Sequence, residues 1–310
     1  MRTERFAVII VGAGPSGLSC ALDLHESRIS YVVLERNPEL GGQLVEIENT
    51  IRDFAAGLFE NGNALKQQLA AQCQQLGINI RYNSPAENIN LARKSVACAG
   101  IVYESDVIVM ATGCRARKLV VPGIARAAND VFYYSEHNLD KLSERPIAIV
   151  GGGDNALMDA VQLAQTAPIV YLINRSNRLK ARADVVQMAR SNERIKLLLE
   201  HELAQVISED GKMKSVSVFD RVGCLNHTLE VERLLIRAGS APNTEQVKGQ
   251  VRMDEQGRIY IDQWCSTSAH GFYACGDISS PGYARLATAL GHGSLAALAI
   301  RTNRTPQNHA

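Results

Sequence analysis

The chain has 310 residues, a length typical of about two domains, and 46% of them are hydrophobic, which is enough for two cores. The net charge is +1 and the basic residues are scattered, so the chain offers no field that would attract nucleic acid or an anionic membrane. No apolar run approaches the roughly 20 residues that a membrane span needs. We therefore expect a cytoplasmic protein without nucleic-acid or membrane partners.

The chain has seven cysteines, and no two of them are fewer than ten positions apart in the sequence. The sequence therefore contains no C-x-x-C, and it indicates neither a metal site nor a local redox dithiol. We expect most of these cysteines to be small buried hydrophobic residues.

The first informative stretch joins an apolar segment, residues 6–11, to the turn Gly12-Ala13-Gly14-Pro15-Ser16-Gly17. Residues 18–24 then have helical character, which gives the order strand, glycine turn, helix. In a dinucleotide site the first glycine allows the turn, the second admits the pyrophosphate, and the third lets helix and strand pack closely. The free N–H groups at the helix start face the phosphates.

A second apolar strand, residues 30–34, ends in Glu35, which lies 21 residues beyond Gly14. An acid at this point can accept hydrogen bonds from both ribose hydroxyls of a dinucleotide. The alternative is an ordinary strand–turn–helix with a surface glutamate. The complete fingerprint favours the dinucleotide interpretation.

The next features are turns and short elements. Gly41-Gly42-Gln43-Leu44 is a flexible turn with one amide, and residues 45–57, which include Asp53, have no clear period. A helix is predicted over residues 64–76, and Gly77 is its C-cap. Strands are predicted over residues 78–82 and 95–103.

Residues 106–110 form a continuous apolar run, as expected of a strand buried on both faces, and the run ends in Ala111-Thr112-Gly113. Pro122-Gly123 then predicts a turn and a linker.

A second glycine turn follows the apolar strand at residues 147–150. It reads Gly151-Gly152-Gly153-Asp154-Asn155-Ala156, and a helix over 157–165 and a strand over 169–173 come after it. Each such unit needs its own strand, turn and helix in phase. Two units in one chain therefore argue against a chance match.

The two units differ at the end of the second strand. The position 21 residues past Gly153 is Asn174, and Arg175, Arg178, Lys180 and Arg182 follow it. No acid is present to bond a free 2′-hydroxyl, whereas the cations suit a 2′-phosphate and hence NADPH. The alternative is a solvated basic face, which most charge runs are.

The remaining elements complete the two units. Short strands are predicted over residues 195–237, and the turn-rich segment 237–244 leads back to the first unit. Strands are also predicted over 257–262 and over 272–278, where the second contains Gly276-Asp277. The last predicted helix, residues 284–301, is interrupted by Gly291-His292-Gly293.

With these motifs placed, the chain resembles the low-molecular-weight thioredoxin reductase-like flavoproteins over essentially its whole length. The motifs that carry the resemblance are the two glycine turns, Gly41-Gly42-Gln43-Leu44, Ala111-Thr112-Gly113 and Tyr273-Ala274-Cys275-Gly276-Asp277. The resemblance implies an α/β fold of two Rossmann-like three-layer nucleotide-binding domains, the second inserted in the first. It implies FAD in residues 1–116 and 244–310, NADPH in residues 117–243, and a homodimer.

The resemblance also implies the cofactor-binding residues. FAD contacts are expected from the first turn and from Glu35, Arg36, Gly42, Gln43, Leu44, Asp53, Ala111, Thr112, Gly113, Gly276, Asp277, Leu286 and Ala287. Asp277 corresponds to the acid that bonds the flavin ribitol. NADPH contacts are expected from Gly151, Gly153, Asp154, Asn155, Ala156, Arg175, Lys180 and Arg182.

One departure from this family bears on the reaction. Thioredoxin reductases have a C-x-x-C shortly before the second glycine turn, and the same place here is Tyr134-Ser135-Glu136-His137. A local dithiol relay is therefore absent, since no thiol is there to attack a disulfide. Residues 132–142 and 286–291 are more similar to the ferredoxin/flavodoxin–NADP reductase branch, whereas residues 239–244 are more similar to thioredoxin reductases.

Three functions stay open from the sequence. The first is an NADPH-dependent reductase of a small redox protein, such as ferredoxin or flavodoxin, or of a small-molecule acceptor. The second is a disulfide reductase that uses a distant cysteine, Cys20 or Cys275. The third is a flavin-binding sensor with little turnover.

No catalytic residue is predicted firmly. His137 and His292 are candidates for a proton donor or a flavin-facing group, against the simpler interpretation of surface or packing histidines. Tyr133 and Tyr134 are candidates to stack near the isoalloxazine, or equally to be core residues.

Overall fold

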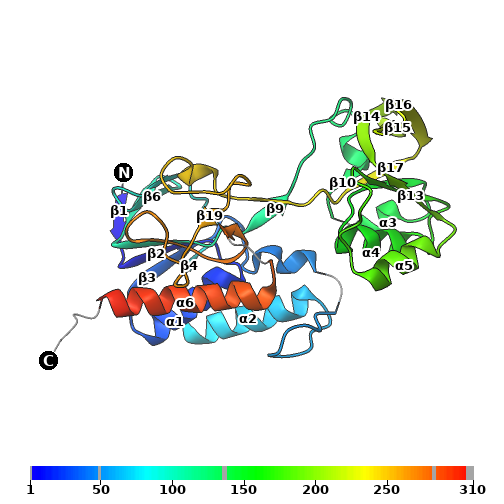
Figure 1. The fold of residues 1–310 in the computed structure, drawn as a ribbon. Coiled ribbons are helices and arrows are strands. Elements are labelled where there is room, and N and C mark those ends of the chain that lie inside the picture. The colour runs from blue at the N-terminus through cyan, green and yellow to red at the C-terminus, as the bar shows by residue number, and fades with distance from the viewer. Residues whose placement is uncertain (1, 48–49, 135–137, 281–283, 305–310) are drawn as a thin grey trace. The chain divides into compact units, whose positions relative to one another are not determined.

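The computed structural model describes residues 2–47, 50–134, 138–280 and 284–304. The chain forms two compact units, which Figure 1 shows. Unit 1 comprises Met1–Arg115 and Ala241–Ala310, and unit 2 comprises Ala116–Ser240. In the described part of the chain, every helix is too short or too polar to span a bilayer. The assignment of one nucleotide to each unit stays a prediction.

The central layer of unit 1 is a parallel sheet in the order β20-β8-β2-β3-β4. Its strands are β2 (Val8–Val11), β3 (Tyr31–Leu34), β4 (Ile80–Arg81), β8 (Val107–Met110) and β20 (Phe272–Ala274). Chain order runs outward from β2 to β3 and β4, and then returns to β8 on the other side of β2. The switch point of the sheet therefore lies between β2 and β8.

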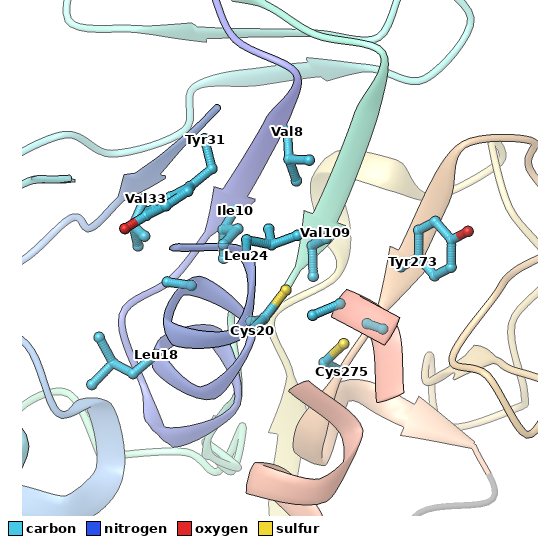
Figure 2. Close-up of a cluster of buried hydrophobic side chains, with 14 of the residues drawn as sticks. Val8, Ile10, Leu18, Cys20, Leu24, Tyr31, Val33, Val109, Tyr273 and Cys275 are labelled. Carbon is cyan, nitrogen blue, oxygen red and sulfur yellow. The ribbon is translucent and has the colours of Figure 1, made fainter. Parts of the chain in front are cut away.

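Helices cover one face of this sheet. They are α1 (Pro15–Glu26), α2 (Gly62–Leu76) and α6 (Leu286–Arg304). Val8, Ile10, Val33 and Val109 pack here with residues of α1, as Figure 2 shows. The helix prediction for α2 is confirmed, because Asn61 caps its start through the Ala64 N–H and Gly77 ends it with φ of 66°.

A second sheet covers the other face of unit 1. It contains β1 (Arg2–Arg5), β7 (Ile101–Glu104), β6 (Ser95–Cys98) and β5 (Asn88–Asn90) in that order. Its Ile89, Val96 and Tyr103 pack against Ile9 and Ile108 of the parallel sheet. Alternate residues of each parallel strand thus enter different cores, which explains why residues 107–110 are continuously apolar.

Short elements complete unit 1 and its connections. They are η1 (Gly42–Glu46), β9 (Cys114–Ala116), which pairs with β18 (Ser240–Pro242), η4 (Glu245–Val247), β19 (Ile259–Tyr260), which pairs with β21 (Ser279–Ser280), and η5 (Gly276–Ile278).

Unit 2 repeats the three-layer plan. Its parallel sheet has the order β10-β17-β11-β12-β13, with β10 (Val131–Phe132), β11 (Ile147–Val150), β12 (Val170–Asn174), β13 (Ile195–Leu199) and β17 (Arg233–Ile236). On one face lie α4 (Asp154–Leu163) and α5 (Ala183–Arg190), which share a core with Ile147, Ile149 and Leu172. The short elements η2 (Ala128–Asp130) and α3 (Leu139–Leu142) precede them in the chain.

The other face of the unit 2 sheet is covered by an antiparallel sheet. It consists of β14 (His201–Glu209), β15 (Lys212–Asp220) and β16 (Leu225–Glu230). Val206, Val216 and Val218 pack against Ala148, Ile173 and Leu234. The prediction of several short strands over residues 195–237 is confirmed.

Three predictions of local structure are wrong. Residues 95–103 form the hairpin β6–β7 instead of one strand, because Ala99 and Gly100 adopt positive φ and turn the chain. Pro122-Gly123 forms the predicted turn but is not a linker, because it lies within unit 2 and packs against β14, where the Val206 N–H donates to the Pro122 carbonyl at 2.9 Å. The predicted interruption of the last helix is also absent.

That last helix, α6, continues through Gly291-His292-Gly293. A Cβ on Gly293 would lie 2.1 Å from the Ser16 carbonyl oxygen and 2.9 Å from the Cys20 nitrogen. The glycine therefore serves the close approach of α6 to α1, and it does not break the helix.

Candidate functional site

The predicted FAD segments of unit 1 meet at the carboxyl edge of its parallel sheet. A Cβ on Gly12 would lie 2.4 Å from the Ala111 carbonyl oxygen, and the Gly41 N–H donates to the Ala13 carbonyl at 2.8 Å. A Cβ on Gly276 would lie 2.7 Å from Ser16 Oγ. Segments from four distant parts of the chain thus form one site beside the switch point of the sheet.

The three glycines of the first turn have different surroundings. Gly12 has φ of 107°, and a Cβ on Gly17 would lie 2.0 Å from the Gly12 carbonyl oxygen, so both positions need glycine for the fold itself. A Cβ on Gly14 would meet nothing within 4 Å. Gly14 is the N-cap of α1, which has Pro15 in its first turn and no side-chain cap. The open side of Gly14 thus adjoins uncapped helix N–H groups, an arrangement that fits a pyrophosphate.

Glu35 is buried at the end of β3, with only 4% of its surface exposed. Its Oε2 accepts from the Ala13 N–H and its Oε1 from the Asn37 N–H, both at 2.8 Å. Each carboxylate oxygen keeps a second lone pair for a ribose hydroxyl. Arg36, the next residue, is exposed. The open helix start and the Glu35 carboxylate therefore fit the pyrophosphate and the ribose of FAD.

Asp277 and His292 are neighbours at the Gly276 turn of this site. The pKa of Asp277 is raised by burial, an effect that Arg258 and His292 oppose. The Nδ1 of His292 accepts from the Gly276 N–H at 3.3 Å, and burial lowers its pKa. These contacts are those of a neutral packing histidine that supports the Gly276 turn. The other candidate, His137, lies outside the described residues.

The remaining predicted FAD residues surround this centre. Thr112 Oγ1 donates to the Asn243 carbonyl at 2.7 Å, and Asn243 Nδ2 donates to the Thr112 carbonyl at 2.9 Å. Gln43 Nε2 would lie 3.5 Å from a Cβ on Gly113. Asp53 is exposed and pairs with Arg285 at 2.9 Å, whereas Leu44 is buried and Leu286 and Ala287 begin α6.

The glycine turn of unit 2 has the same geometry. Gly151 has φ of 153°, and a Cβ on it would lie 2.5 Å from the Arg237 carbonyl oxygen. A Cβ on Gly153 would meet nothing within 4 Å, and α4 has no side-chain cap. Asn155 and Ala156 follow in the first turn of α4, as predicted. The open space at this helix start fits a second dinucleotide.

The segment after β12 folds over this second turn. Asn174 Nδ2 donates to the carbonyls of Ser176 at 2.8 Å and Arg178 at 3.3 Å, and the Lys180 N–H donates to the Gly152 carbonyl at 2.7 Å. Asn174, which stands where unit 1 has Glu35, therefore holds the loop with the basic residues Arg175, Arg178, Lys180 and Arg182 beside the glycine turn.

Within that loop the cations differ in their surroundings. Arg182 lies 3.9 Å from Asp154 and 3.7 Å from Asp184. Arg175 lines a pocket of about 360 Å³ together with Ser176, Asn177, Glu200, Arg221 and Val222. This pocket presents the Arg175 and Arg221 guanidinium groups, which suit a phosphate group.

Six of the seven cysteines are buried, as predicted, and Cys224 is exposed. Sequence reasoning missed that Cys265 and Cys275 are neighbours, because both thiols donate to the His292 carbonyl, at 3.4 and 3.5 Å. Burial raises the pKa of Cys20, and the hydrogen bond with Cys265, together with burial, raises that of Cys275. Cys20 and Cys275 are therefore thiols at neutral pH.

The two predicted aromatic candidates belong to unit 2. Tyr134 Oη accepts from the Ala116 N–H at 3.1 Å, and its ring lies 5.8 Å from the Arg237 guanidinium carbon. Tyr133 packs against the core beneath β17. Both side chains thus have contacts within their own unit.

Two three-layer α/β units, each with an open glycine turn at the switch point of a parallel sheet, define a protein that binds two dinucleotides. The chain belongs to the pyridine nucleotide-disulphide oxidoreductase family, whose model matches residues 6–293. It is thioredoxin reductase-like and is an NADPH-dependent flavoprotein oxidoreductase. The thioredoxin reductase family uses FAD and NADPH.

Relatives of known sequence and structure share this organisation. The chain is 29% identical to thioredoxin reductase of Mycolicibacterium smegmatis over 94% of each chain. It is 26% identical to a 34.2 kDa protein in the rubredoxin operon of Clostridium pasteurianum, over 95% of this chain and 96% of that one. The crystal structure of Lactococcus lactis thioredoxin reductase has a TM-score of 0.87 at 25% identity, covering 96% of this chain and 98% of that chain.

Proposed function

We propose that the chain passes electrons from NADPH through FAD to a small soluble acceptor without a redox-active cysteine pair. The observation that carries this proposal is the pair of open glycine positions, Gly14 and Gly153, each at an uncapped helix start. When bound, FAD and NADPH supply the electron-transfer chemistry. The chain supplies binding, orientation and electrostatics.

In unit 1, the N–H groups of α1 would hold the FAD pyrophosphate, and the remaining lone pairs of Glu35 would hold the ribose. Asp277 would bond the ribitol, and His292 would keep the Gly276-Asp277 turn in place through its Gly276 contact. Burial raises the pKa of Asp277, and the carboxylate oxygens would accept hydrogen bonds from the ribitol hydroxyl groups.

In unit 2, the N–H groups of α4 would hold the NADPH pyrophosphate. Asn174 would position the loop, and Arg175 would read the 2′-phosphate from the pocket that it shares with Arg221. A guanidinium can contact a phosphate through two parallel hydrogen bonds, which suits discrimination between NADPH and NADH. Lys180 and Arg182 add positive charge nearby.

The acceptor is proposed to be a small redox protein. The sequence has no C-x-x-C, and a thiol buried with a raised pKa is a poor nucleophile toward a disulfide. The relative described as a protein in a rubredoxin operon supports an acceptor of this class. We also propose that the chain forms a homodimer, to be measured by light scattering during size-exclusion chromatography.

A disulfide reductase that uses a distant cysteine is the second candidate. The observation in its favour is the adjacency of Cys265 and Cys275, both of which donate to the His292 carbonyl. The burial of both side chains argues against it, because a substrate disulfide must reach the attacking sulfur.

The first experiment mixes the FAD-loaded protein anaerobically with NADPH, and separately with NADH, while the oxidised-flavin absorbance is followed. Fast bleaching by NADPH alone supports the reductase, whereas bleaching by neither nucleotide favours a flavin-binding sensor. Gly14→Ala and Gly153→Ala are matched variants, because neither Cβ meets protein atoms. Gly14→Ala should lose FAD, and Gly153→Ala should keep FAD and bleach slowly.

The acceptor is tested with the same protein. Reduced enzyme is offered a flavodoxin, a ferredoxin, a rubredoxin and a small disulfide, and the experiment is repeated with Cys265→Ser and Cys275→Ser. Turnover of a redox protein with unchanged rates in both variants supports the proposal. Turnover of the disulfide that either substitution abolishes would establish the second candidate instead.

A further inference from the structure

Three metal-binding side chains meet on the antiparallel sheet of unit 2, although the sequence predicted no metal site. Strand pairing places His201 of β14 opposite Asp220 of β15, and His227 of β16 opposite Val218. Val218 and Asp220 are two residues apart, so all three side chains share one face of the sheet. One ligand atom from each residue lies within 4.8 Å of the other two.

Neighbouring backbone groups orient two of these side chains. The Leu199 carbonyl can only accept, so His201 Nδ1, at 2.6 Å, donates its proton there and leaves the Nε2 lone pair free. Asp220 Oδ1 accepts from the Val222 N–H at 2.9 Å. Such outer contacts fix the tautomer and direction of ligands in metal sites. The rings of His201 and His227 lie 6.0 Å apart, centre to centre.

The chemistry of the ligands selects the metal. Two imidazole nitrogens and one carboxylate oxygen suit zinc, whereas calcium and magnesium take oxygen ligands. Tetrahedral zinc with bonds of about 2.0–2.1 Å needs ligand atoms about 3.4 Å apart, so small side-chain rotations bring these three into position. Because His227 is exposed, water can take the fourth place.

We propose that His201, Asp220 and His227 bind one zinc ion, and that the ion fixes the turn that carries Arg221 into the Arg175 pocket. Arg221 directly follows Asp220, its Nη1 donates to the Arg175 carbonyl at 3.0 Å, and Arg221 and Val222 both line that pocket. The second half of the proposal rests on the proposed function, because it takes this pocket as the 2′-phosphate site. Bound zinc would then raise the affinity for NADPH.

The site is tested by zinc calorimetry and by cobalt absorbance on the full FAD-loaded chain, in a Cys224→Ser background that removes the exposed thiol. We expect one equivalent of zinc, and affinity about 10- to 100-fold lower or lost in His201→Ala and in His227→Ala. His270→Ala, an exposed histidine of unit 1, is the matched control.

Zinc uptake that is unchanged in the His201→Ala/His227→Ala double variant, with far-UV circular dichroism like that of the parent, would overturn the site. The coupling is measured as the NADPH KM with and without zinc, in the parent and in His227→Ala. An NADPH KM that zinc changes in the parent alone supports the coupling. A parent KM that is equal with and without zinc overturns the coupling. Calorimetry needs no NADPH, so a chain that fails to react with NADPH still decides the zinc site.

Discussion

Counted from the first glycine of each turn, Cys20 of unit 1 and Asp159 of unit 2 occupy the same place, eight residues on. The carbonyls that approach those first glycines belong to Ala111 in unit 1 and Arg237 in unit 2. In unit 1, Cys20, which Figure 2 shows, is part of an apolar core that also contains Ala111. In unit 2, Asp159 and Arg237 form an ion pair whose side chains are only 8% and 9% exposed.

The two units share the glycines that form each turn, and they differ in the side chains that pack behind those glycines. Both turns use a first glycine at positive φ, pressed against a neighbouring strand end, and a second glycine with open space. One turn is supported by apolar packing and the other by a buried ion pair. In the proposed function the choice of nucleotide is made elsewhere, at the end of the next strand, where Glu35 is buried and Asn174 holds a cationic loop.

The largest expected effect comes from the buried ion pair. Asp159→Ala leaves the Arg237 charge in the interior and should destabilise unit 2 by about 3–5 kcal/mol. Urea unfolding followed by far-UV circular dichroism measures the loss. Trp264, the one tryptophan of the chain, lies in unit 1, so its fluorescence reports that unit separately.

The control is Glu232→Ala, which removes the exposed partner of Arg145. An exposed pair contributes about 1 kcal/mol or less. If Asp159→Ala cost no more than this control, the ion pair would add nothing to the support of the second turn.

The next effect concerns the third position of each turn, which is Gly17 in unit 1 and Ala156 in unit 2. Gly17→Ala puts a methyl group 2.0 Å from the Gly12 carbonyl oxygen, so we expect a loss of about 3 kcal/mol and of FAD content. Ala156→Gly removes a methyl group that already fits and should cost about 1 kcal/mol. Thermal unfolding and the flavin-to-protein absorbance ratio measure both, and equal costs would mean that the two helices approach their strands alike.

The sequence predicted both glycine turns, their strands and α2, because these depend on local patterns of glycine and apolar residues. It did not predict the contacts between distant segments. In the sequence, Gly293 is typical of a helix break, and only the fold shows that it allows α6 to approach α1 closely. The proximity of the Cys265 and Cys275 thiols depends on how the chain returns to β20. The approach of His201, Asp220 and His227 depends on strand register, which no short motif encodes.

A smaller effect is expected at the nucleotide-reading end of unit 2. Arg175→Gln removes the proposed phosphate contact and should raise the NADPH KM about tenfold, or about 1.4 kcal/mol, with NADH kinetics unchanged. Lys196→Gln, which removes an exposed charge from β13 in the same unit, is the control and should change neither value. An equal rise of the KM for NADPH and of the KM for NADH would show that Arg175 does not bind the 2′-phosphate.

The smallest effect is a pH dependence of stability in unit 1. Burial lowers the pKa of His292 in the folded state, so unfolding takes up a proton just below the ordinary histidine pKa of about 6.5. Stability should therefore fall as the pH drops through this window. The raised pKa of Asp277 acts oppositely and at lower pH, where stability falls as the pH rises.

His292→Gln removes the histidine titration and keeps a side-chain oxygen that can accept from the Gly276 N–H. Between pH 8 and pH 5.5, its melting temperature should decline less than that of the parent, and exposed His270→Gln should follow the parent. Equal declines in all three proteins would mean that the imidazole stays solvated when the chain folds. The contact with Gly276 would then not be what keeps the Asp277 turn in place.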